Sequence, residues 1–261
     1  MKSLTTHIEE RLQLNRDRVH KIEYEYFPKT KNEFVDIIYK ITEENKKDKI
    51  INLNMIDTSE ITNMSYLFYK SQYNYDISEW DVSNVVDMSS MFANSKFNND
   101  ISKWNVSHVT NMDCMFEGSI FNDDISHWDV SHVTNMNGMF RFDKEFNQYL
   151  GDWNMSNVVN TCGMFNGCSK FRGDGLKQWN VSNVRNMSYM FKNAEEFNED
   201  ISTWKLYKYV KMRNIFATYD NISPYNATSN KKIVLKFNHD LTPWVSQIKK
   251  EEKQYIKDYI K

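Results

Sequence analysis

The sequence predicts an α/β repeat solenoid, in which about seven rungs of 24–26 residues stack on one another. Three observations predict this fold class: tryptophans recur at nearly constant spacing, other apolar residues recur at fixed distances from them, and each copy is too short to bury its own apolar side chains. Successive tryptophans are 24, 24, 25, 26 and 25 residues apart. The six residues expected to form this core column are Trp80, Trp104, Trp128, Trp153, Trp179 and Trp204.

A short strand is expected at each tryptophan. In residues 77–82 the apolar side chains alternate with polar ones, which places Trp80 and Val82 on one face of an extended chain and Glu79 and Asp81 on the other. Copies of this strand in successive rungs would pair in parallel, about 4.8 Å apart.

A short helix is expected after each strand. Methionine, methionine and phenylalanine recur 8, 11 and 12 residues after the tryptophan, which is the spacing of one helical face, and a preceding Ser, Thr or Asn could serve as its N-cap. The pattern therefore predicts one helix per rung. The phenylalanines expected to form a second core column are Phe92, Phe116, Phe140, Phe165, Phe191 and Phe216.

Both ends of the repeat array need covers, because a raw apolar rung would otherwise face water. Leu4, Ile8 and Leu12 indicate a first helix, alternation over residues 22–26 indicates a strand, and Thr30 with Glu33 forms a capping box before a second helix. The sequence thus predicts an N-terminal cap over residues 1–49 and the repeat solenoid over residues 50–220.

The C-terminal cap is expected over residues 221–261. Residues 232–237 have the composition of a strand, and Thr242 with Pro243 is a typical helix start. The Lys/Glu mixture from Lys249 to Lys261 is interpreted as the solvated face of this helix; the alternative is a basic docking surface for an acidic partner.

The repeat unit F-N-x-D-I-S-x-W-x-V-S-x-V-x-N-M-x-x-M-F, seen in residues 97–116, resembles the repeat of BspA-type leucine-rich-repeat-like surface proteins, also described as mycoplasma lipoprotein-associated repeats. The match covers around two thirds of the chain. Residues 26–34 followed by 56–59 resemble the leader that usually precedes these repeats. The resemblance implies a leucine-rich-repeat-like solenoid and a surface or interaction role rather than a reaction.

Composition excludes several classes of function. The formal net charge of −2 lacks the positive balance that non-specific nucleic-acid binders need, so we expect no nucleic-acid partner.

No apolar run reaches 18 residues and the opening is polar, so we expect neither a membrane span nor a signal peptide. A cytoplasmic or virion-associated location is therefore favoured over secretion. The three cysteines form no CxxC pair, which predicts free thiols.

Three polar patterns could hold an ion or serve the fold. Asp76, Asp100, Asp124 and Asp200 share one position in their rungs and could bind calcium or close Asx-turns, and we favour the turns. Columns of asparagine are interpreted as ladders that satisfy backbone groups at bends. A metal site or pH switch formed by His108, His132 and His127 is the less favoured interpretation, so no metal and no cofactor is expected.

A recognition surface is expected where the repeat does not dictate the residue. The position before each tryptophan changes charge and size at every rung, whereas the position after it stays Asp or Asn until Lys205. The varied column is the candidate partner-binding surface on the strand face. Its residues are Glu79, Lys103, His127, Asp152, Gln178 and Thr203.

The sequence therefore predicts a non-enzymatic protein–protein interaction module, because no nucleophile elbow, phosphate loop or catalytic triad is present. The alternatives are a structural or assembly component, for example of a phage or a cell envelope, that associates with its own copies through the solenoid ends, and a surface adhesin. The identity of the partner is not specified by the residues.

Overall fold

The computed structural model describes residues 23–218 and 235–261. Its elements are helix α2 (Lys31–Asn45), strands β1 (Ile51–Asn52) and β2 (Tyr75–Asp76), and the 3-10 helices η1 (Leu176–Gln178), η2 (Thr242–Trp244), η3 (Lys250–Tyr255) and η4 (Lys257–Tyr259). The strands pair in parallel, Ile51 with Tyr75 and Asn52 with Asp76. The helix predicted around Leu4, Ile8 and Leu12, and the first half of the strand predicted at 232–237, lie outside the described residues.

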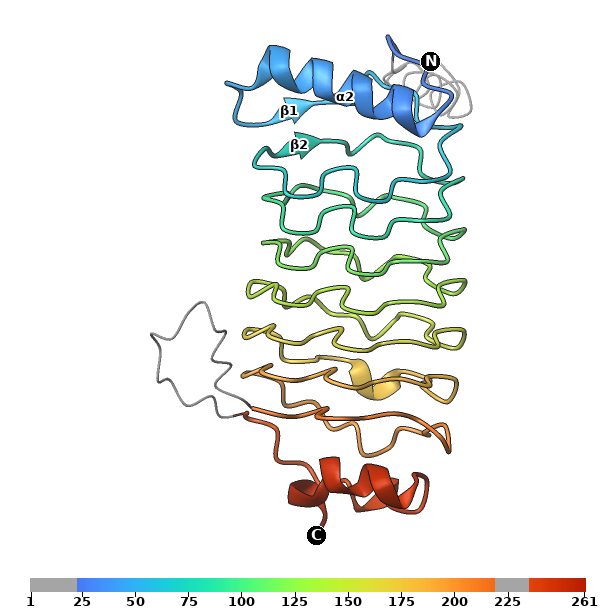
Figure 1. Cartoon of the computed structure of the whole chain (residues 1–261), viewed down its shortest axis with the longest axis vertical. Coiled ribbons are helices and arrows are strands. Elements are labelled where there is room, and N and C mark those ends of the chain that lie inside the picture. Colours follow the sequence, from blue (N-terminus) through green and yellow to red (C-terminus); the bar gives the residue numbers. More distant parts are fainter. Residues whose placement is uncertain (1–22, 219–234) are drawn as a thin grey trace, which may run out of the picture.

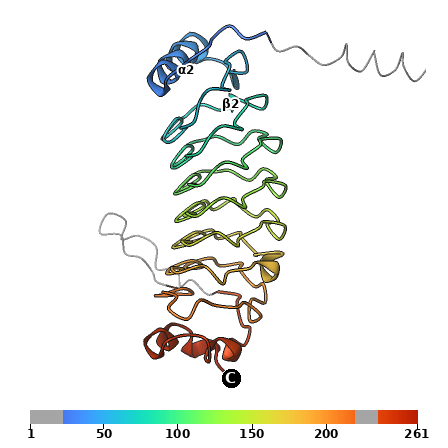
Figure 2. The same cartoon turned by 90° about the vertical axis from the view of Figure 1, so that its right-hand side faces the viewer.

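The predicted fold class is wrong. An α/β solenoid of seven rungs, each with a strand and a helix, would carry regular elements throughout, but the described repeats consist mainly of turns and irregular chain. Among the described residues, the one α-helix and the two-stranded sheet belong to the first part of the chain, and η1 is the only helical turn between residues 80 and 218. Irregular copies of the repeat are nevertheless layered one on another, as both views show (Figures 1 and 2).

Single parallel bridges and aromatic contacts join successive repeats. The bridge position lies seven residues after each tryptophan and pairs Asn111 with Asn135, and Asn135 with Asn160, among others. Phenylalanine rings stack along the whole array, with centroids 5.4 Å apart for Phe92 and Phe116 and 5.7 Å apart for Phe191 and Phe216. The six repeat tryptophans are all at most 4% exposed, so the core runs as columns of like side chains.

The segment predicted to be a helix is instead a run of tight turns. Ser90 and Asn94 have φ values of 53° and 56°, so left-handed residues recur where a helix would need right-handed ones. The N–H groups of Met88, Ser90 and Phe92 donate to carbonyls of the next repeat at 2.8–3.0 Å. Alternate N–H groups therefore pair between repeats, while those of Met91 and Ala93 donate within the segment, to Met88 and Ser90 at 3.2 Å. The backbone N–H of Asn94 likewise donates to the carbonyl oxygen of Glu117 at 2.6 Å.

The segment predicted to be a strand is a tight turn. The N–H of Trp104 donates to the carbonyl oxygen of Ile101 at 3.2 Å, and the same carbonyl accepts the indole N–H of Trp128 at 3.2 Å. Equivalent indole bonds occur at every tryptophan of the repeats. Because both lone pairs of this carbonyl are used, no backbone ladder forms there.

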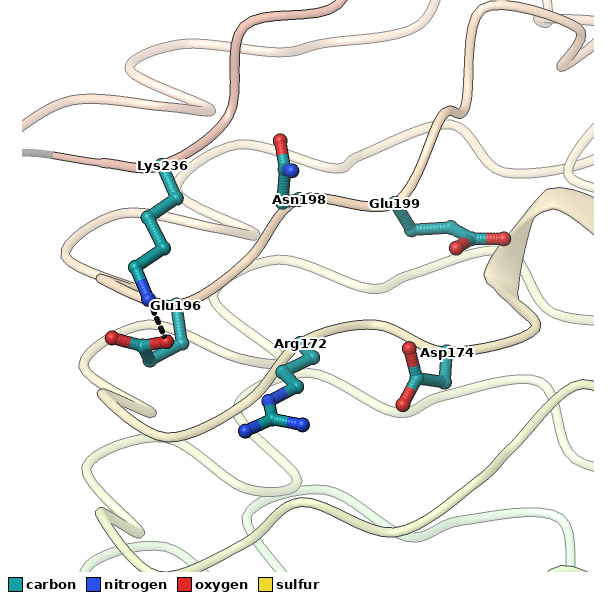
Figure 3. Close-up of a pocket in the computed structure, with 6 residues that line it drawn as sticks. All are labelled: Arg172, Asp174, Glu196, Asn198, Glu199 and Lys236. Atoms are coloured by element: carbon teal, nitrogen blue, oxygen red, sulfur yellow. Dashed lines mark hydrogen bonds and ion pairs between the residues drawn. The ribbon is translucent and has the colours of Figure 1, made fainter.

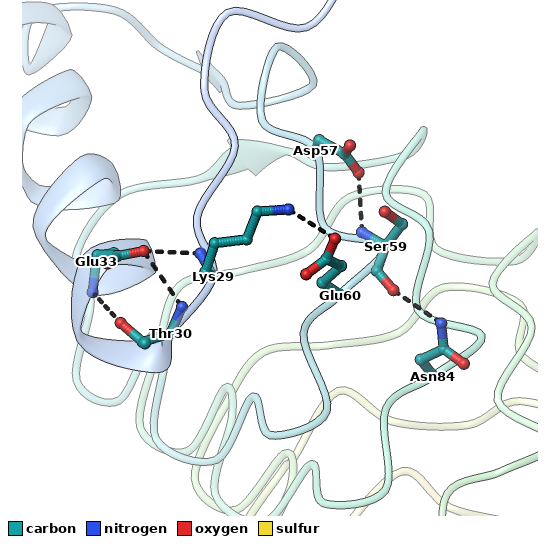
Figure 4. A network of polar contacts seen from close by, with 7 residues as sticks. All are labelled: Lys29, Thr30, Glu33, Asp57, Ser59, Glu60 and Asn84. Carbon is teal, nitrogen blue, oxygen red and sulfur yellow. Dashed lines mark hydrogen bonds and ion pairs between the residues drawn. The ribbon is translucent and has the colours of Figure 1, made fainter.

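Helix α2 covers the first repeat. As predicted, Thr30 and Glu33 form a capping box: the Thr30 hydroxyl accepts from the Glu33 N–H at 3.2 Å, and the Glu33 carboxylate accepts from the Thr30 N–H at 3.3 Å (Figure 4). Lys29 extends from this turn to Glu60, 2.6 Å away, in the first repeat. The ammonium of Lys31 donates to the carbonyl oxygen of Ser65 at 2.6 Å. The helix therefore caps exposed carbonyls with a cation.

The other end is covered by the 3-10 helices η2, η3 and η4, where the sequence predicted one longer α-helix. The indole of Trp244 stacks on that of Trp204 with centroids 6.0 Å apart. Phe237, which is not in a strand, continues the phenylalanine column at 4.5 Å from Phe216. The carboxylate of Glu252 accepts from the N–H of Met212 at 2.9 Å, so an anion caps this end.

Candidate functional site

The six residues of the varied column are all exposed in the structure. They lie on the successive tight turns just before the tryptophans, so the surface they form follows turns and not the face of a strand. The Gln178 side chain donates to the Tyr149 hydroxyl at 3.1 Å. In the described part of the chain, Lys103, His127 and Asp152 have no side-chain hydrogen bond or ion pair, so these groups are available to a partner.

The position after each tryptophan serves the fold in five of the six repeats. The carboxylate of Asp81 accepts the N–H of Ser83 at 3.0 Å, and Asp129 accepts from Ser131 in the same way. The equivalent asparagines make the same local bond. Lys205 replaces this acceptor in the last repeat, so its exposed ammonium is not committed to a turn.

A shallow hollow of about 470 Å³ opens on this surface at the last two repeats. Two of its lining residues, Gln178 and Thr203, belong to the varied column. Trp179 is only 4% exposed and forms part of the wall. The hollow combines amide, hydroxyl and ammonium groups, which can pair with both the N–H and the C=O of a peptide. Its lining residues are Gln178, Trp179, Asn180, Ser182, Thr203 and Lys205.

A second hollow, of about 310 Å³, lies on another side of the same repeats and carries charges of both signs (Figure 3). Lys236 is paired there with Glu196. Arg172, Asp174 and Glu199 also line it. Three carboxylates and two cations line this hollow, so its formal charge is close to balanced and does not mark it as a site for an acidic ligand.

An apolar groove of about 400 Å³ separates α2 from the first repeat. Val35 and Tyr39 of the helix form one side, and Leu67 and Tyr73 form the other. Val35 and Tyr39 are 41% and 67% exposed. The groove therefore presents apolar surface at the N-terminal end of the described repeats, away from the varied column.

The acidic column closes Asx-turns, as predicted. The carboxylate of Asp100 accepts the N–H of Ser102 at 2.9 Å, and Asp124 accepts from Ser126 at 2.9 Å. These bonds lower the pKa of both carboxyls, because they stabilise the charged form. The aspartates thus have partners in their own turns. The equivalent bonds at Asp76 and Asp200 are also present.

The asparagine ladders are confirmed as well. The Asn135 amide donates to Asn111 at 3.2 Å and receives the amide of Asn160 at 3.1 Å. In the second column, the side-chain oxygen of Asn98 accepts the backbone N–H of Asn122 at 3.0 Å. Both columns therefore satisfy polar groups between repeats.

Two cysteine thiols are buried in the structure, and burial disfavours their charged form. Burial raises the pKa of the Cys114 thiol to about 12, with Asp113 and Glu117 adding to the effect. Burial also raises the pKa of Cys168. No group of three or more His, Cys, Asp or Glu side chains there is placed to hold a metal ion, and His108 and His132 are exposed.

Comparison with known families identifies the repeat. A family model described as "Mycoplasma protein of unknown function, DUF285" matches residues 37–148, 118–228 and 142–258. The chain belongs to this family. No curated protein and no solved structure matches the sequence. In this DUF285 chain, the described residues contain no helix long and apolar enough to cross a membrane.

Two features of this DUF285 chain were missed in the sequence. In five repeats a buried valine stands five residues after the tryptophan, but Tyr209 at this position of the last repeat is 51% exposed and Val210 is buried in its place. Trp244 was assigned to the cap, yet it occupies the next place in the tryptophan column. The signal for the first was the break in the repeat at Lys205, where Lys, Leu, Tyr, Lys, Tyr replaces the usual polar turn.

Proposed function

We propose that this protein is a non-enzymatic protein-binding module, whose partner is recognised along the varied column from Glu79 to Thr203. One observation carries the proposal. The six side chains are exposed and chemically different from one repeat to the next, while the tryptophans beside them are buried and invariant in type. A rigid framework that displays varied groups in a regular row suits recognition of an extended surface.

The covers at both ends favour side-on recognition over association through the ends. Helix α2 and the 3-10 helices satisfy the outermost polar groups through Lys31 and Glu252. The raised thiol pKa values of Cys114 and Cys168 also favour a binding role over catalysis, since a protonated buried thiol is a poor nucleophile. A relationship to BspA-type surface proteins would fit the same role.

Site-specific photo-crosslinking tests this proposal. A photoreactive amino acid would replace Lys103 in one variant and His127 in another, with Lys144, an exposed residue outside the varied column, as the matched control position. We expect protein adducts from the native cell at the two column positions and none at the control position. Equal adduct patterns at all three positions would contradict recognition along the column.

A further inference from the structure

The formal charge of the repeats changes along the chain, from negative in residues 71–95 to positive in residues 201–219. Residues 71–95 contain four carboxylates and no Lys or Arg, whereas residues 201–219 contain four cations and no Asp or Glu. Residues 175–194 also lack carboxylates. Residues 195–200 carry four carboxylates, so residues 175–218 together hold seven cations against four carboxylates and are net positive. The cations of residues 201–219 are Lys205, Lys208, Lys211 and Arg213.

Part of this charge is gathered around two tyrosines that interrupt the repeat. The Arg185 guanidinium lies 4.3 Å from the ring centroid of Tyr207, and Lys249 of the C-terminal cap lies 4.8 Å from that of Tyr209. Lys208 lies 5.6 Å from the Tyr209 ring, and the two rings are 5.7 Å apart. The rings hold several cations beside one another without neutralising them.

The nearest carboxylates do not neutralise the cluster. Glu251 is 3.6 Å from Lys249, and both side chains are largely exposed, so this pair is weak. Glu252 is committed to the backbone N–H of Met212. Arg185, Lys205 and Lys208 have no ion pair with any described residue. The cluster is therefore a net positive surface in the folded protein.

We propose that these cations form a docking site for an acidic peptide segment of a protein partner, which also occupies the adjoining hollow. The "basic cluster" comprises Arg185, Lys205, Lys208 and Lys249. Lys205 lines the hollow and lies two residues before Tyr207, so a bound chain can pair its carboxylates with the cluster and its backbone with Gln178 and Asn180. This assignment rests on the proposed function and names the chemistry of the partner.

A peptide fits the site better than a phosphate polymer. The hollow offers amide groups that both donate and accept hydrogen bonds, as a peptide backbone requires, whereas phosphate oxygens only accept. Arg185 and Lys249 each lie over a tyrosine ring, so they occupy positions where bases would otherwise stack.

Fluorescence anisotropy with a fluorescein-labelled octapeptide of alternating Glu and Ser tests the assignment on the full chain at 50 mM NaCl. Replacing Lys205, Lys208 and Lys249 together by Gln is expected to raise the Kd at least tenfold. The matched control replaces exposed Lys47, Lys49 and Lys96 by Gln, which removes the same charge elsewhere, and should change the Kd less than twofold. Replacing the same three lysines of the cluster by Arg should leave the Kd of the Glu/Ser peptide nearly unchanged. An octapeptide of alternating Gln and Ser, which has no carboxylate side chains, should not bind.

Several results would overturn the assignment. These are no binding of the Glu/Ser peptide, equal weakening by both triple variants, or tighter binding of a labelled eight-nucleotide oligothymidylate. If the protein forms a concentration-dependent dimer that only the Gln variant of the cluster abolishes, the occupant of the site is the acidic segment, residues 71–95, of a second copy. If adducts still form at Lys103 and His127 while the cluster variant changes nothing, the assignment fails and the proposed function stands.

Discussion

The indole nitrogen of Trp244 donates a hydrogen bond of 3.2 Å to the carbonyl oxygen of Ile201. Trp204 makes the equivalent bond to Leu176 at 2.8 Å. Trp244 is fully buried although it lies outside the repeat spacing. The cap therefore binds the array by copying the contact that joins the repeats to one another.

Replacing Trp244 by Ala should lower the free energy of unfolding by about 3–5 kcal/mol, because it removes both the buried indole and its hydrogen bond. Trp244→Phe keeps most of the apolar area and should cost about 1–2 kcal/mol. Urea denaturation followed by circular dichroism measures both. A loss below 1 kcal/mol for the alanine variant would mean that the cap does not depend on this column.

Gly138 and Ser90 both have left-handed backbone, so substitutions at the two positions should change the stability in opposite directions. Gly138 has φ 58°, and an added Cβ would lie 3.1 Å from the Cys114 sulfur, so Gly138→Ala should destabilise by about 1–2 kcal/mol. Ser90→Gly should stabilise by up to about 1 kcal/mol, since glycine adopts φ 53° without strain. A helix in this segment would reverse both signs, so thermal denaturation of the two variants distinguishes the conformations.

Asp143 should make stability depend on pH. Its carboxyl is fully buried and accepts from the Ser119 hydroxyl at 2.6 Å; burial raises its pKa from 3.8 to about 6. Between about pH 4 and pH 6 the folded state holds this proton more tightly than the unfolded state, so the contribution of Asp143 to stability falls as pH rises.

Asp143→Asn removes this titration while keeping the shape of the side chain. Relative to the wild type, the variant should gain about 3 kcal/mol of stability between pH 4 and pH 7, measured by urea denaturation at each pH. Taking the difference between variant and wild type removes the contribution of the other carboxyls to the pH dependence. Asp124 is one of these, and its lowered pKa makes stability rise with pH. A constant difference across this range would contradict the buried, protonated carboxyl.

Breaking an asparagine ladder should be costly. Asn135→Ala removes the amide bonds with Asn111 and Asn160 and the bond to the N–H of Asn137. We expect a loss of about 3 kcal/mol, at about 1 kcal/mol for each bond. Asn238→Ala, at an exposed position outside both asparagine columns, is the matched control and should cost about 0.5 kcal/mol or less. Equal losses in the two variants would show that the ladder contributes nothing specific.

The columns of like residues could be predicted from spacing alone, because a buried position recurs wherever one copy covers the next. The capping box of α2 and the turns at Asp100 and Asp124 were also predictable, since each depends on two or three neighbouring residues. The local conformation was not. The spacing of Met88, Met91 and Phe92 fits a helix equally well, and only the left-handed residues such as Ser90 and Gly138 distinguish the two.

The exposed row was likewise predictable from its variation, but not the turn that carries it. That turn forms because the Trp128 indole takes the second lone pair of the Ile101 carbonyl, a contact between repeats that periodicity does not reveal. The basic cluster was hidden for a similar reason: Tyr209 stands where the other repeats carry a buried valine, and only the structure shows that Tyr209 is exposed and that Lys249 lies beside it.

The direction of the N–H groups at Met88, Ser90, Phe92 and Asn94 gives this edge of the protein an electrical polarity. Each of these peptide groups carries a dipole, and repeated alignment adds them as in an α-helix, with the positive pole toward the C-terminal end. Lys31 at the carbonyl end and Glu252 at the N–H end have the signs that this field favours. Exchanging their charges would place each ion at the pole that repels it.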